Sequence, residues 1–334
     1  MTSMDLVPLT ADDLEAFDRF FGVFDRQQRA EREFPSLSAL EEARVLFTRP
    51  STYHEWRGLL AVDDGEVMGA AWLDWPLLEN TDFLSAQIVV EPGHRRRGVG
   101  SRILDAVLEM ACELGRRSLL AELATPHRGA QTTPGVAFAE HHGFVRKHTE
   151  LHLVLQTPVT DTALATLAAE AAPHHHGYRL VQRGQECPPE WVDEFCALLS
   201  LMGDETPMGD LELEAATYTP ERLREVESRR RQSHLFTGTN VAVAPDGSLA
   251  GYTLMAGSHD QAEIFQWDTL VRPDHRGRRL GLAMKVANLC WLQARHDASI
   301  VHTRNSEVNA PMLAVNRAMG FRPVEYLGEW QREV

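Results

Sequence analysis

Cysteine is scarce in this chain, and its spacing argues against two kinds of protein. The 334 residues contain four cysteines: Cys112, Cys187, Cys196 and Cys290. None shows the close spacing of a zinc site, and the four do not form the dense framework of a disulfide-stapled domain. We therefore expect reduced thiols, a cytoplasmic setting and no bound metal.

Long apolar runs and a basic start are also missing. The first five residues, Met1 to Asp5, carry no positive side chain. No apolar stretch is long enough to cross a bilayer. The sequence therefore predicts neither a signal peptide nor a membrane partner.

Positive charge is in deficit. The chain has 33 Lys and Arg against 48 Asp and Glu, which gives a formal net charge of −15. This balance argues against a nucleic-acid partner, because a phosphate backbone binds basic surfaces. Basic residues nevertheless gather in two short segments, Arg95 to Arg97 and Arg276 to Arg279, which favours a small polyanionic ligand.

The two basic segments belong to an internal repeat. Residues 90–100 read Val-Glu-Pro-Gly-His-Arg-Arg-Arg-Gly-Val-Gly, and 181 positions later residues 271–281 read Val-Arg-Pro-Asp-His-Arg-Gly-Arg-Arg-Leu-Gly. In each copy an apolar strand, a Pro, a basic turn containing Gly and an apolar helix follow one another. Such a turn gathers backbone N–H groups at a helix start, where an anion such as a pyrophosphate binds.

Two further marks keep the same order in both halves. The pairs Asp64-Gly65 and Asp246-Gly247 lie between apolar runs and predict hairpin turns, because Gly accepts positive φ freely. Gly-Phe follows the last expected helix of each half, at residues 143–144 and 320–321. A repeat this long is a duplicated domain and not a solenoid.

The length suits two domains of roughly 150 residues each. Helices and strands alternate in both halves, which predicts an α/β fold with a mixed sheet. We expect an N-terminal domain at 1–157, a linker at 158–176 and a C-terminal domain at 177–334. The linker is marked by Thr157-Pro158, an alanine-rich segment and the break from Pro173 to Gly177.

The strand, basic turn and helix resemble the acyl-CoA-binding motif of the GNAT acetyltransferase superfamily, whose turn reads Gln/Arg-x-x-Gly-x-Gly/Ala. Arg95 to Gly100 matches this motif fully. The second copy matches at Arg276 and Gly281 but has Arg279 where Gly is usual. The resemblance covers nearly the whole chain, as a tandem GNAT protein of actinobacterial type. It implies two GNAT-like domains, each a mixed, mostly antiparallel central sheet flanked by helices.

The resemblance also implies acetyl-CoA as cosubstrate. Its pyrophosphate would rest on the amides of each turn and helix start, and its pantetheine arm would pair with the preceding strand. In the first half this assigns Ile88, Val89, Val90, Arg95, Arg96, Arg97, Gly98, Val99, Gly100 and Ser101. In the second half it assigns Thr269, Leu270, Val271, Arg276, Gly277, Arg278, Arg279, Leu280, Gly281 and Leu282.

The catalytic groups depart from the family pattern. GNAT proteins often place a Tyr, as general acid, four residues before the Gly of Gly-Phe, where this chain has Ala139 and Asn316. This absence leaves the protonation of the leaving thiolate to another group or to water.

The incoming amine must lose a proton, so a base or a water chain is needed. A carboxylate on the strand before the second turn is our candidate, either Glu263 or Asp268. His259 and His302 are further candidates. The alternative interpretation of Glu263 and Asp268 is that each is a surface carboxylate at a strand edge with no catalytic role.

The two halves differ after their last strand. In GNAT proteins an Asn in this segment commonly binds the pantetheine or the phosphates, and the second half offers Asn305, Asn309 and Asn316. Residues 125–135 of the first half contain no Asn. Since the first half has the cleaner turn and the second the better pantetheine segment, we expect catalysis in the second half.

The sequence thus predicts a GNAT N-acetyltransferase that moves acetyl from acetyl-CoA to the primary amine of a small molecule by direct attack on the thioester. Its expected partner is that amine acceptor, with no nucleic acid and no membrane, in a monomer or homodimer. Two alternatives stay open. One is a non-catalytic acyl-CoA-binding or sensor protein, which the missing Tyr favours, and the other is a protein N-acetyltransferase.

Overall fold

The computed structural model describes residues 4–37, 39–126, 132–259 and 261–334. Two segments used in the sequence analysis lie outside the described residues. They are Met1 to Ser3, from the start of the chain, and residues 127–131, from the segment without Asn. The chain forms two compact units. The first contains residues up to 149, 209–213 and 326–334, and the second contains 150–208 and 214–325.

The sheet of the first unit has the strand order β1-β2-β3-β4-β5-β12. Its strands are β1 (Asp5–Pro8), β2 (His54–Asp63), β3 (Glu66–Pro76), β4 (Phe83–Val90), β5 (Ser118–Thr125) and part of β12 (Arg322–Glu333). Strands β4 and β5 are parallel, whereas the other described pairs are antiparallel. The mixed, mostly antiparallel sheet that the sequence predicts is confirmed.

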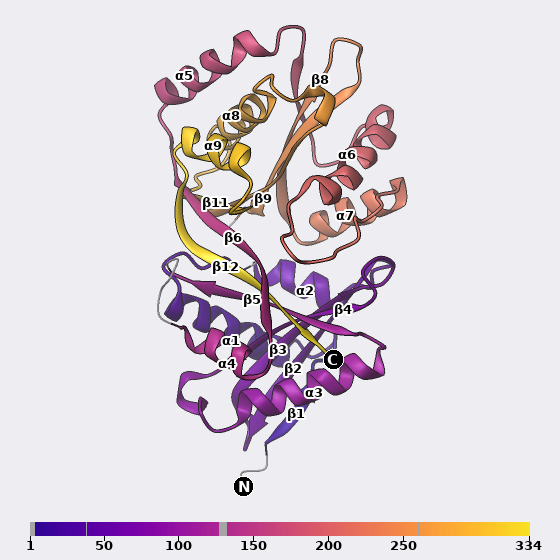
Figure 1. The fold of residues 1–334 in the computed structure, drawn as a ribbon, viewed down its shortest axis with the longest axis vertical. Helices are drawn as coiled ribbons and strands as arrows, with labels where there is room; N and C mark the ends of the chain where they lie inside the picture. Colours follow the sequence, from indigo (N-terminus) through magenta and orange to yellow (C-terminus); the bar gives the residue numbers. More distant parts are fainter. Residues whose placement is uncertain (1–3, 38, 127–131, 260) are drawn as a thin grey trace. The chain divides into compact units, whose positions relative to one another are not determined.

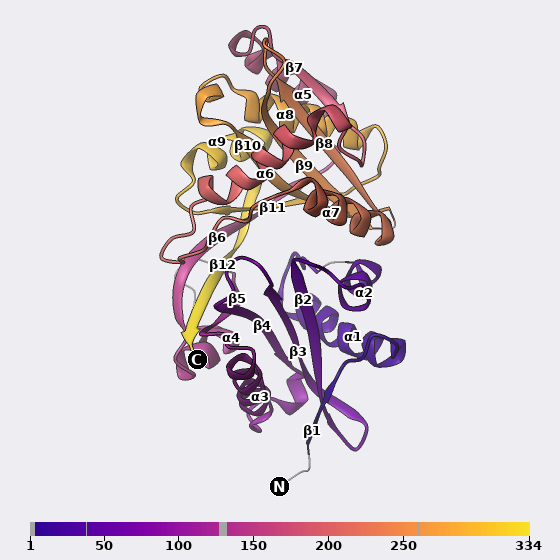
Figure 2. The same cartoon turned by 90° about the vertical axis from the view of Figure 1, so that its right-hand side faces the viewer.

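Helices cover both faces of this sheet (Figure 2). The helices are α1 (Leu14–Glu31), α2 (Leu40–Thr48), α3 (Val99–Glu113) and α4 (Pro134–His141). Helix α1 packs on Leu60 and Ala70, whereas α3 and α4 pack on the other face with Leu59 and Ala71. Neighbouring strand residues point to opposite faces, so the alternation in β2 and β3 fixes which helices lie on which side.

The second unit repeats this plan, with the strand order β6-β11-β10-β9-β8-β7. Its strands are part of β6 (Val145–Gln156), β7 (Arg179–Arg183), β8 (Leu235–Val243), β9 (Leu249–Ser258), β10 (Glu263–Val271) and β11 (Ile300–Ser306). Strands β10 and β11 are parallel, and the other described pairs are antiparallel.

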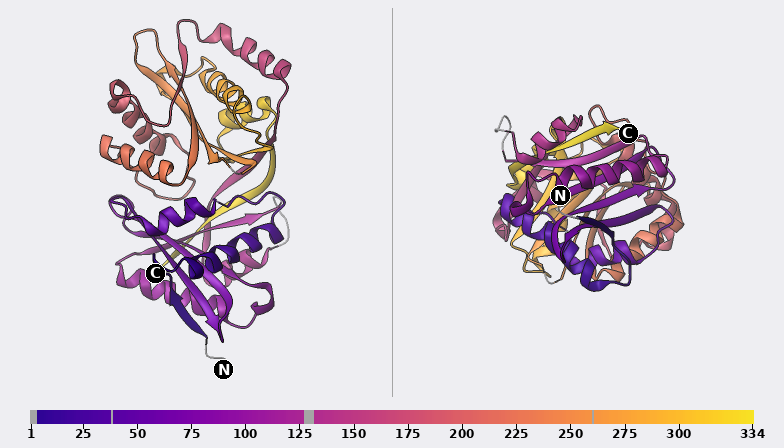
Figure 3. Two further views of the ribbon diagram at one scale, coloured as in Figure 1. Left: turned by 180° about the vertical axis from the view of Figure 1, so that it is seen from behind. Right: turned by 90° about the horizontal axis from the view of Figure 1, so that it is seen from below.

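Helices again lie on both faces of the sheet (Figures 1 and 3). They are α5 (Asp161–Ala171), α6 (Val192–Glu205), α7 (Pro220–Gln232), α8 (Leu280–Gln293) and α9 (Ala310–Met319). Helices α6 and α7 pack on the face that holds Val241, and α8 packs on the face that holds Ala242. Among the described residues, no helix is long and apolar enough to cross a membrane.

Each unit takes one strand of its sheet from a distant part of the sequence. Residues 326–333 of β12 pair with β5 in the first unit, and residues 150–156 of β6 pair with β11 in the second. These contacts divide the chain differently from the expected domains 1–157 and 177–334. Residues 158–176, the expected linker, contain α5, which packs on α8 within the second unit. Local sequence patterns do not record which sheet edge a strand joins, because the ladder hydrogen bonds are non-local.

The role of the C-terminal strand can be tested at Trp330, which is buried in the core of the first unit. We expect Trp330→Ala to destabilise the first unit by about 3–5 kcal/mol. Hydrogen exchange followed by mass spectrometry should show faster exchange in α3 and β5 and unchanged exchange in β8 and β9. The matched control is Phe321→Ala, buried nearby in the sequence but within the second unit. The domain division would be wrong if Trp330→Ala loosened β8 and β9 alone.

Candidate active site

The two parallel strand pairs stop pairing early. Residues 83–85 of β4 pair with 118–120 of β5, and residues 263–265 of β10 pair with 300–302 of β11. Beyond these points, residues 86–90 and 266–271 continue to the basic turns without pairing with their parallel neighbours. Each sheet therefore has an open backbone edge beside its turn, which suits an extended ligand that adds main-chain hydrogen bonds.

The two turns have the same backbone conformation despite different sequences. In the first, Arg96 and Gly98 are left-handed, with φ of 63° and 84°. In the second, Gly277 and Arg279 occupy the same two places, with φ of 79° and 51°. One Gly and one Arg share the left-handed positions in each turn, in opposite order. The departure from the motif at Arg279 therefore leaves the turn intact, at a cost of about 1–2 kcal/mol for a left-handed side-chain residue.

Both helix starts keep their backbone N–H groups free of protein acceptors. The first helical hydrogen bonds run from Arg102 N to Gly98 O and from Ala283 N to Arg279 O, each 3.0 Å long. Among the described residues, no amide of 96–101 or 277–282 donates to a protein oxygen. Such amides at a helix N-terminus form an anion site, because the helix dipole adds to their positive ends.

The first Arg of each turn holds the turn to its surroundings. The Nε–H groups of Arg95 and Arg276 donate to the last carbonyl of the preceding strand, over 3.0 and 3.1 Å. The same guanidinium groups pair with the last residues of α1 and α6, Glu31 and Glu205. Both side chains therefore position the turn, and neither guanidinium is left without a protein partner.

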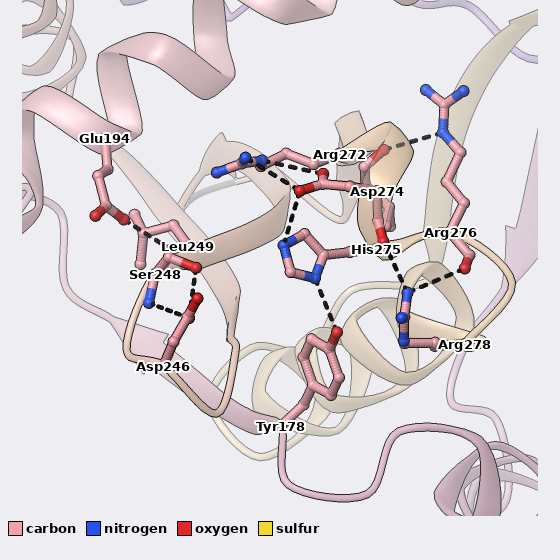
Figure 4. Close-up of polar contacts among 11 residues, drawn as sticks. Tyr178, Glu194, Asp246, Ser248, Leu249, Arg272, Asp274, His275, Arg276 and Arg278 are labelled. Carbon is pink, nitrogen blue, oxygen red and sulfur yellow. Dashed lines mark hydrogen bonds and ion pairs between the residues drawn. The ribbon is translucent and has the colours of Figure 1, made fainter.

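The remaining basic side chains differ between the turns. Arg96 and Arg97 are exposed, and neither makes a hydrogen bond or ion pair with a described residue. In the second turn, Arg278 donates to the turn's own carbonyls (Figure 4), and Arg279 donates to the Glu170 carbonyl over 3.2 Å. The first turn therefore offers free cations besides its amides, whereas the second offers mainly amides.

The other assigned positions divide by burial. The side chains packed in the cores, which leave only backbone for a ligand, are Val89, Val99, Leu270, Leu280 and Leu282. Ile88, Val90, Thr269 and Val271 are half-buried. Gly98 and Gly277 have open space where a Cβ would lie, which leaves their backbone accessible. Ser101 already contacts His142, with 3.1 Å between its hydroxyl and Nε2.

The three predicted Asn residues do not act alike. Asn309 caps α9, its Oδ1 accepting from Met312 N over 3.2 Å. Asn316 is fully buried and donates to Asn305 Oδ1. Asn316 therefore does not face a ligand in this arrangement. Asn305, half-buried on the part of β11 that no longer pairs with β10, is the one whose position suits a pantetheine contact.

A buried lysine contacts Asn316, and the sequence analysis did not identify it. Lys285 of α8 is 1 % exposed, and its Nζ donates to Asn316 Oδ1 over 2.6 Å. The ammonium also lies 5.1 Å from the ring centre of Phe321. Burial lowers the pKa of Lys285 to about 7. Its signal in the sequence is a lone cation on an otherwise apolar helix, which is easily taken for a surface residue.

The lowered pKa of Lys285 predicts a specific pH dependence. Unfolded lysine has a pKa near 10.4, so between about pH 7 and 10 the unfolded chain binds more protons and the free energy of unfolding rises with pH. Lys285→Met should flatten that rise and stabilise the protein at about pH 6 by roughly 2–4 kcal/mol, after the lost hydrogen bond is subtracted. Urea denaturation at about pH 6, 8 and 9.5 measures both effects.

The matched control is Lys147→Met, which alters the chain's other lysine. This variant should keep the wild-type slope. A Lys285→Met protein with the wild-type slope would contradict a neutral Lys285 in the folded state above about pH 7.

The strand before the second turn contains a β-bulge. Its register with β9 shifts between Gln266 and Thr269, so Trp267 and Asp268 lie in the bulge. The buried Gln266 amide fills it and donates to Leu254 O over 2.9 Å. The corresponding strand of the first unit pairs with β3 without a shift from residue 85 to residue 90. Bulges re-aim side chains and are frequent beside active sites.

Asp268 in this bulge has a perturbed carboxyl group. Burial raises its pKa, although the hydrogen bond from the Tyr252 hydroxyl, 3.1 Å away, and the positive Arg230 oppose the shift. Arg230 of α7 stacks over Trp267 at 4.9 Å. A carboxylate with raised proton affinity in the bulge of β10 has the chemistry of a general base.

Glu263 lies at the other end of β10 from the turn. Its side chain is 41 % exposed, and its Oε2 is 3.4 Å from Nε2 of His302. The structure thus brings Glu263 and His302 together and keeps Asp268 apart from them. His259 is exposed, and its ring packs on Phe236.

A cavity of about 500 Å³ lies near the first turn, outside the region between β4 and β5. Its lining residues are Arg19, Arg26, Gly65, Glu66, Val67, Glu91, Gly93 and His94. The charges pair with one another, Arg26 with Glu91 and His94 with Glu66. Among the described residues, no group of three or more His, Cys, Asp or Glu converges as metal ligands.

Known proteins are similar to this chain along most of its length. A family model described as an acetyltransferase (GNAT) domain matches residues 55–146. The mycothiol acetyltransferase of Clavibacter sepedonicus is 28% identical over 244 residues, which cover 72% of this chain and 69% of that protein. The mycothiol acetyltransferase of Clavibacter michiganensis subsp. michiganensis is 28% identical over 263 residues, 78% and 74% of the two chains.

Solved structures show the same architecture. A tandem GNAT protein from the clavulanic acid biosynthesis pathway superposes with a TM-score of 0.81 at 26% identity, over 99% of this chain and 98% of that one. A GCN5-related N-acetyltransferase from Sphaerobacter thermophilus gives a TM-score of 0.65 at 16% identity, over 99% and 95%, a likeness of fold alone.

Proposed function

Because this chain is a tandem GNAT N-acetyltransferase, we propose that it transfers acetyl from acetyl-CoA to the primary amine of a small molecule, with the chemistry in the second unit. One observation carries the proposal. In that unit the open edge of β10, the free amides that begin α8 and two carboxylates all lie along one strand and its turn. The relatives named mycothiol acetyltransferase support a small-molecule acceptor.

The turn and helix start would hold the cosubstrate. The amides from Gly277 to Leu282 have no protein acceptor and would donate to a diphosphate, which the dipole of α8 would stabilise. The pantetheine arm would add to the open edge of β10 from Thr269 to Val271, as an extra strand adds to a sheet. Asn305, whose Oδ1 accepts from Asn316, would hydrogen-bond the same arm.

The bulge suits the reacting end of the acetyl donor. A strand N–H aimed at the thioester oxygen stabilises the negative charge that develops when the amine nitrogen attacks the carbonyl carbon. The new C–N bond forms, the C–S bond breaks, and the leaving CoA thiolate takes up, directly or through water, the second proton that the attacking nitrogen loses. The amine must arrive unprotonated, so Glu263 or Asp268 takes its proton.

The first unit lacks two of the titratable groups of this arrangement, the counterparts of His302 and Asp268. Its last parallel pair is Ser85 with Leu120, whereas the second unit has Phe265 with His302. Where the second unit has Asp268, the repeat places Gln87. We infer that the first unit binds acetyl-CoA through its turn or serves as a scaffold.

The proposed cosubstrate site predicts that a negative charge in the turn opposes binding. Gly281 has room for a side chain, since a Cβ would meet its nearest neighbour at 3.9 Å. Gly281→Asp should weaken acetyl-CoA affinity about tenfold or more, because two like charges a few ångströms apart cost about 1–4 kcal/mol. Gly281→Asn is the matched neutral control, and isothermal titration is the measurement.

The same two substitutions at Gly100 report whether the first turn binds as well, and there Gly100→Asn also controls for crowding, because a Cβ would lie 3.2 Å from Phe138. Wild-type affinity and stoichiometry in Gly281→Asp would place the cosubstrate elsewhere. A wild-type protein that does not bind acetyl-CoA would end the proposal.

The acceptor class predicts a second result. The wild-type enzyme should release CoA thiol with at least one small primary amine from a panel of aminosugars, amino acids and polyamines, and not with peptides. A thiol-trapping assay measures release, and mass spectrometry identifies the acetylated product. Acetylation of peptides alone would make it a protein acetyltransferase.

A further inference from the structure

Four titratable side chains form a continuous chain inside the second unit. Glu263 Oε2 lies 3.4 Å from His302 Nε2, and His302 Nδ1 lies 2.8 Å from His152 Nε2. His152 Nδ1 in turn lies 2.6 Å from Glu325 Oε1. Both imidazoles are fully buried and Glu325 is nearly so, whereas Glu263 is 41 % exposed. This row of four side chains therefore runs from the surface into the protein interior.

The position of His302 connects this row of side chains to the candidate active site between β10 and β11. His302 pairs with Phe265 in the last parallel pair, so its ring lies where β10 and β11 separate. Phe265 stacks on one face of that ring, 4.9 Å away, and His152 stacks at 5.1 Å. Arg304 lies opposite His152 in the register of β6 and β11.

Burying two imidazoles needs a reason beyond folding. A buried polar ring costs free energy unless its nitrogens are hydrogen-bonded. The first unit has Leu120 in its last parallel pair, so a sheet of this kind forms without such rings. His302 Nε2 makes no hydrogen bond of good geometry with any described residue, and Glu263 Oε2 lies 3.4 Å from it.

The hydrogen-bond directions follow from the chemistry of the end groups. An ionised Glu325 only accepts, so His152 donates its Nδ1–H to it. His152 Nε2 then accepts from the Nδ1–H of His302, which leaves His302 Nε2 unprotonated, 3.4 Å from Glu263 Oε2. These tautomers are assigned from the network of contacts.

We propose that Glu263 is the base of the second unit and that His302, His152 and Glu325 form a proton relay behind it. This inference rests on the proposed function. The acceptor ammonium gives a proton to Glu263, which passes a proton to His302 Nε2 while His302 Nδ1–H passes to His152 Nε2. Glu263 is then a carboxylate again, and His152 is an imidazolium beside ionised Glu325. The proton returns to Glu263 and to water by the reverse steps.

In this relay only Glu263 touches the substrate, and the three buried residues are positioning residues that act through it. Glu263→Gln should lower kcat by about 10²–10⁴-fold. His302→Asn keeps the donor to His152 but has no second nitrogen to pass a proton on. It should lower kcat about tenfold or more, shift the acid limb of the pH–kcat profile and leave the KM for acetyl-CoA unchanged.

Combining variants separates a relay from independent effects. The double variant of Glu263→Gln and His302→Asn should be no slower than Glu263→Gln alone, because residues that act as one unit are not additive. Asp268→Asn is the matched control, and its effect should multiply with that of His302→Asn. A His302→Asn enzyme with wild-type kcat and pH profile would overturn the relay.

A second measurement needs no acceptor. In the full chain labelled with nitrogen-15 histidine, the ring signals of His302 and His152 should change together in a pH titration, as coupled groups do. Glu263→Gln should move both sets, and His302→Asn and His152→Asn assign them. Coupled signals without acetyl transfer would refute the proposed function and leave the relay standing. Acetyl transfer with His152 signals that ignore Glu263→Gln would overturn the relay.

Discussion

The arrangement of both sites depends on backbone amides that the fold leaves without protein acceptors. A helix start always has such amides, and most proteins satisfy them with a capping side chain. Here neither α3 nor α8 has a side-chain cap. Two left-handed residues fold each turn, and Arg95 and Arg276 hold the turn against the strand before it. The unsatisfied amides would give an anionic ligand part of its binding energy.

The same motif shows how far sequence reasoning reaches. The repeat predicts both turns, the hairpins and the mixed sheets, because these features depend on local periodicity and on residues next to one another. The mismatch at Arg279 looks like a defect when glycines are counted, yet Gly277 takes the complementary place and the conformation is kept. What the turn requires is two left-handed residues, and either order of Gly and Arg supplies them.

Features that depend on distant strands were not predictable in this way. Strands β6 and β12 pair with β11 and β5 through ladder hydrogen bonds, which leave no trace in the local pattern. His302 is a candidate from the sequence alone, but its partner His152 lies 150 positions earlier. The Asn residues were expected to contact a ligand. The fold uses Asn309 as a helix cap and Asn316 as a partner of buried Lys285, roles set by where the helices pack.

The distribution of buried polar groups argues that the two units have diverged in role. Among the described residues, the buried polar or charged side chains of the first unit are Arg116, Ser118 and His148, whereas the second unit has sixteen, including Gln266, Lys285 and His302. Each such group costs stability unless it is paired. The first unit builds the same sheet without most of them, so the fold does not require this cost. Groups that shift the pKa of catalytic residues are typically buried polar groups that the fold itself does not require. Gln266 and His302 are such groups, and they lie on or beside β10, the strand that carries the bulge and both candidate carboxylates.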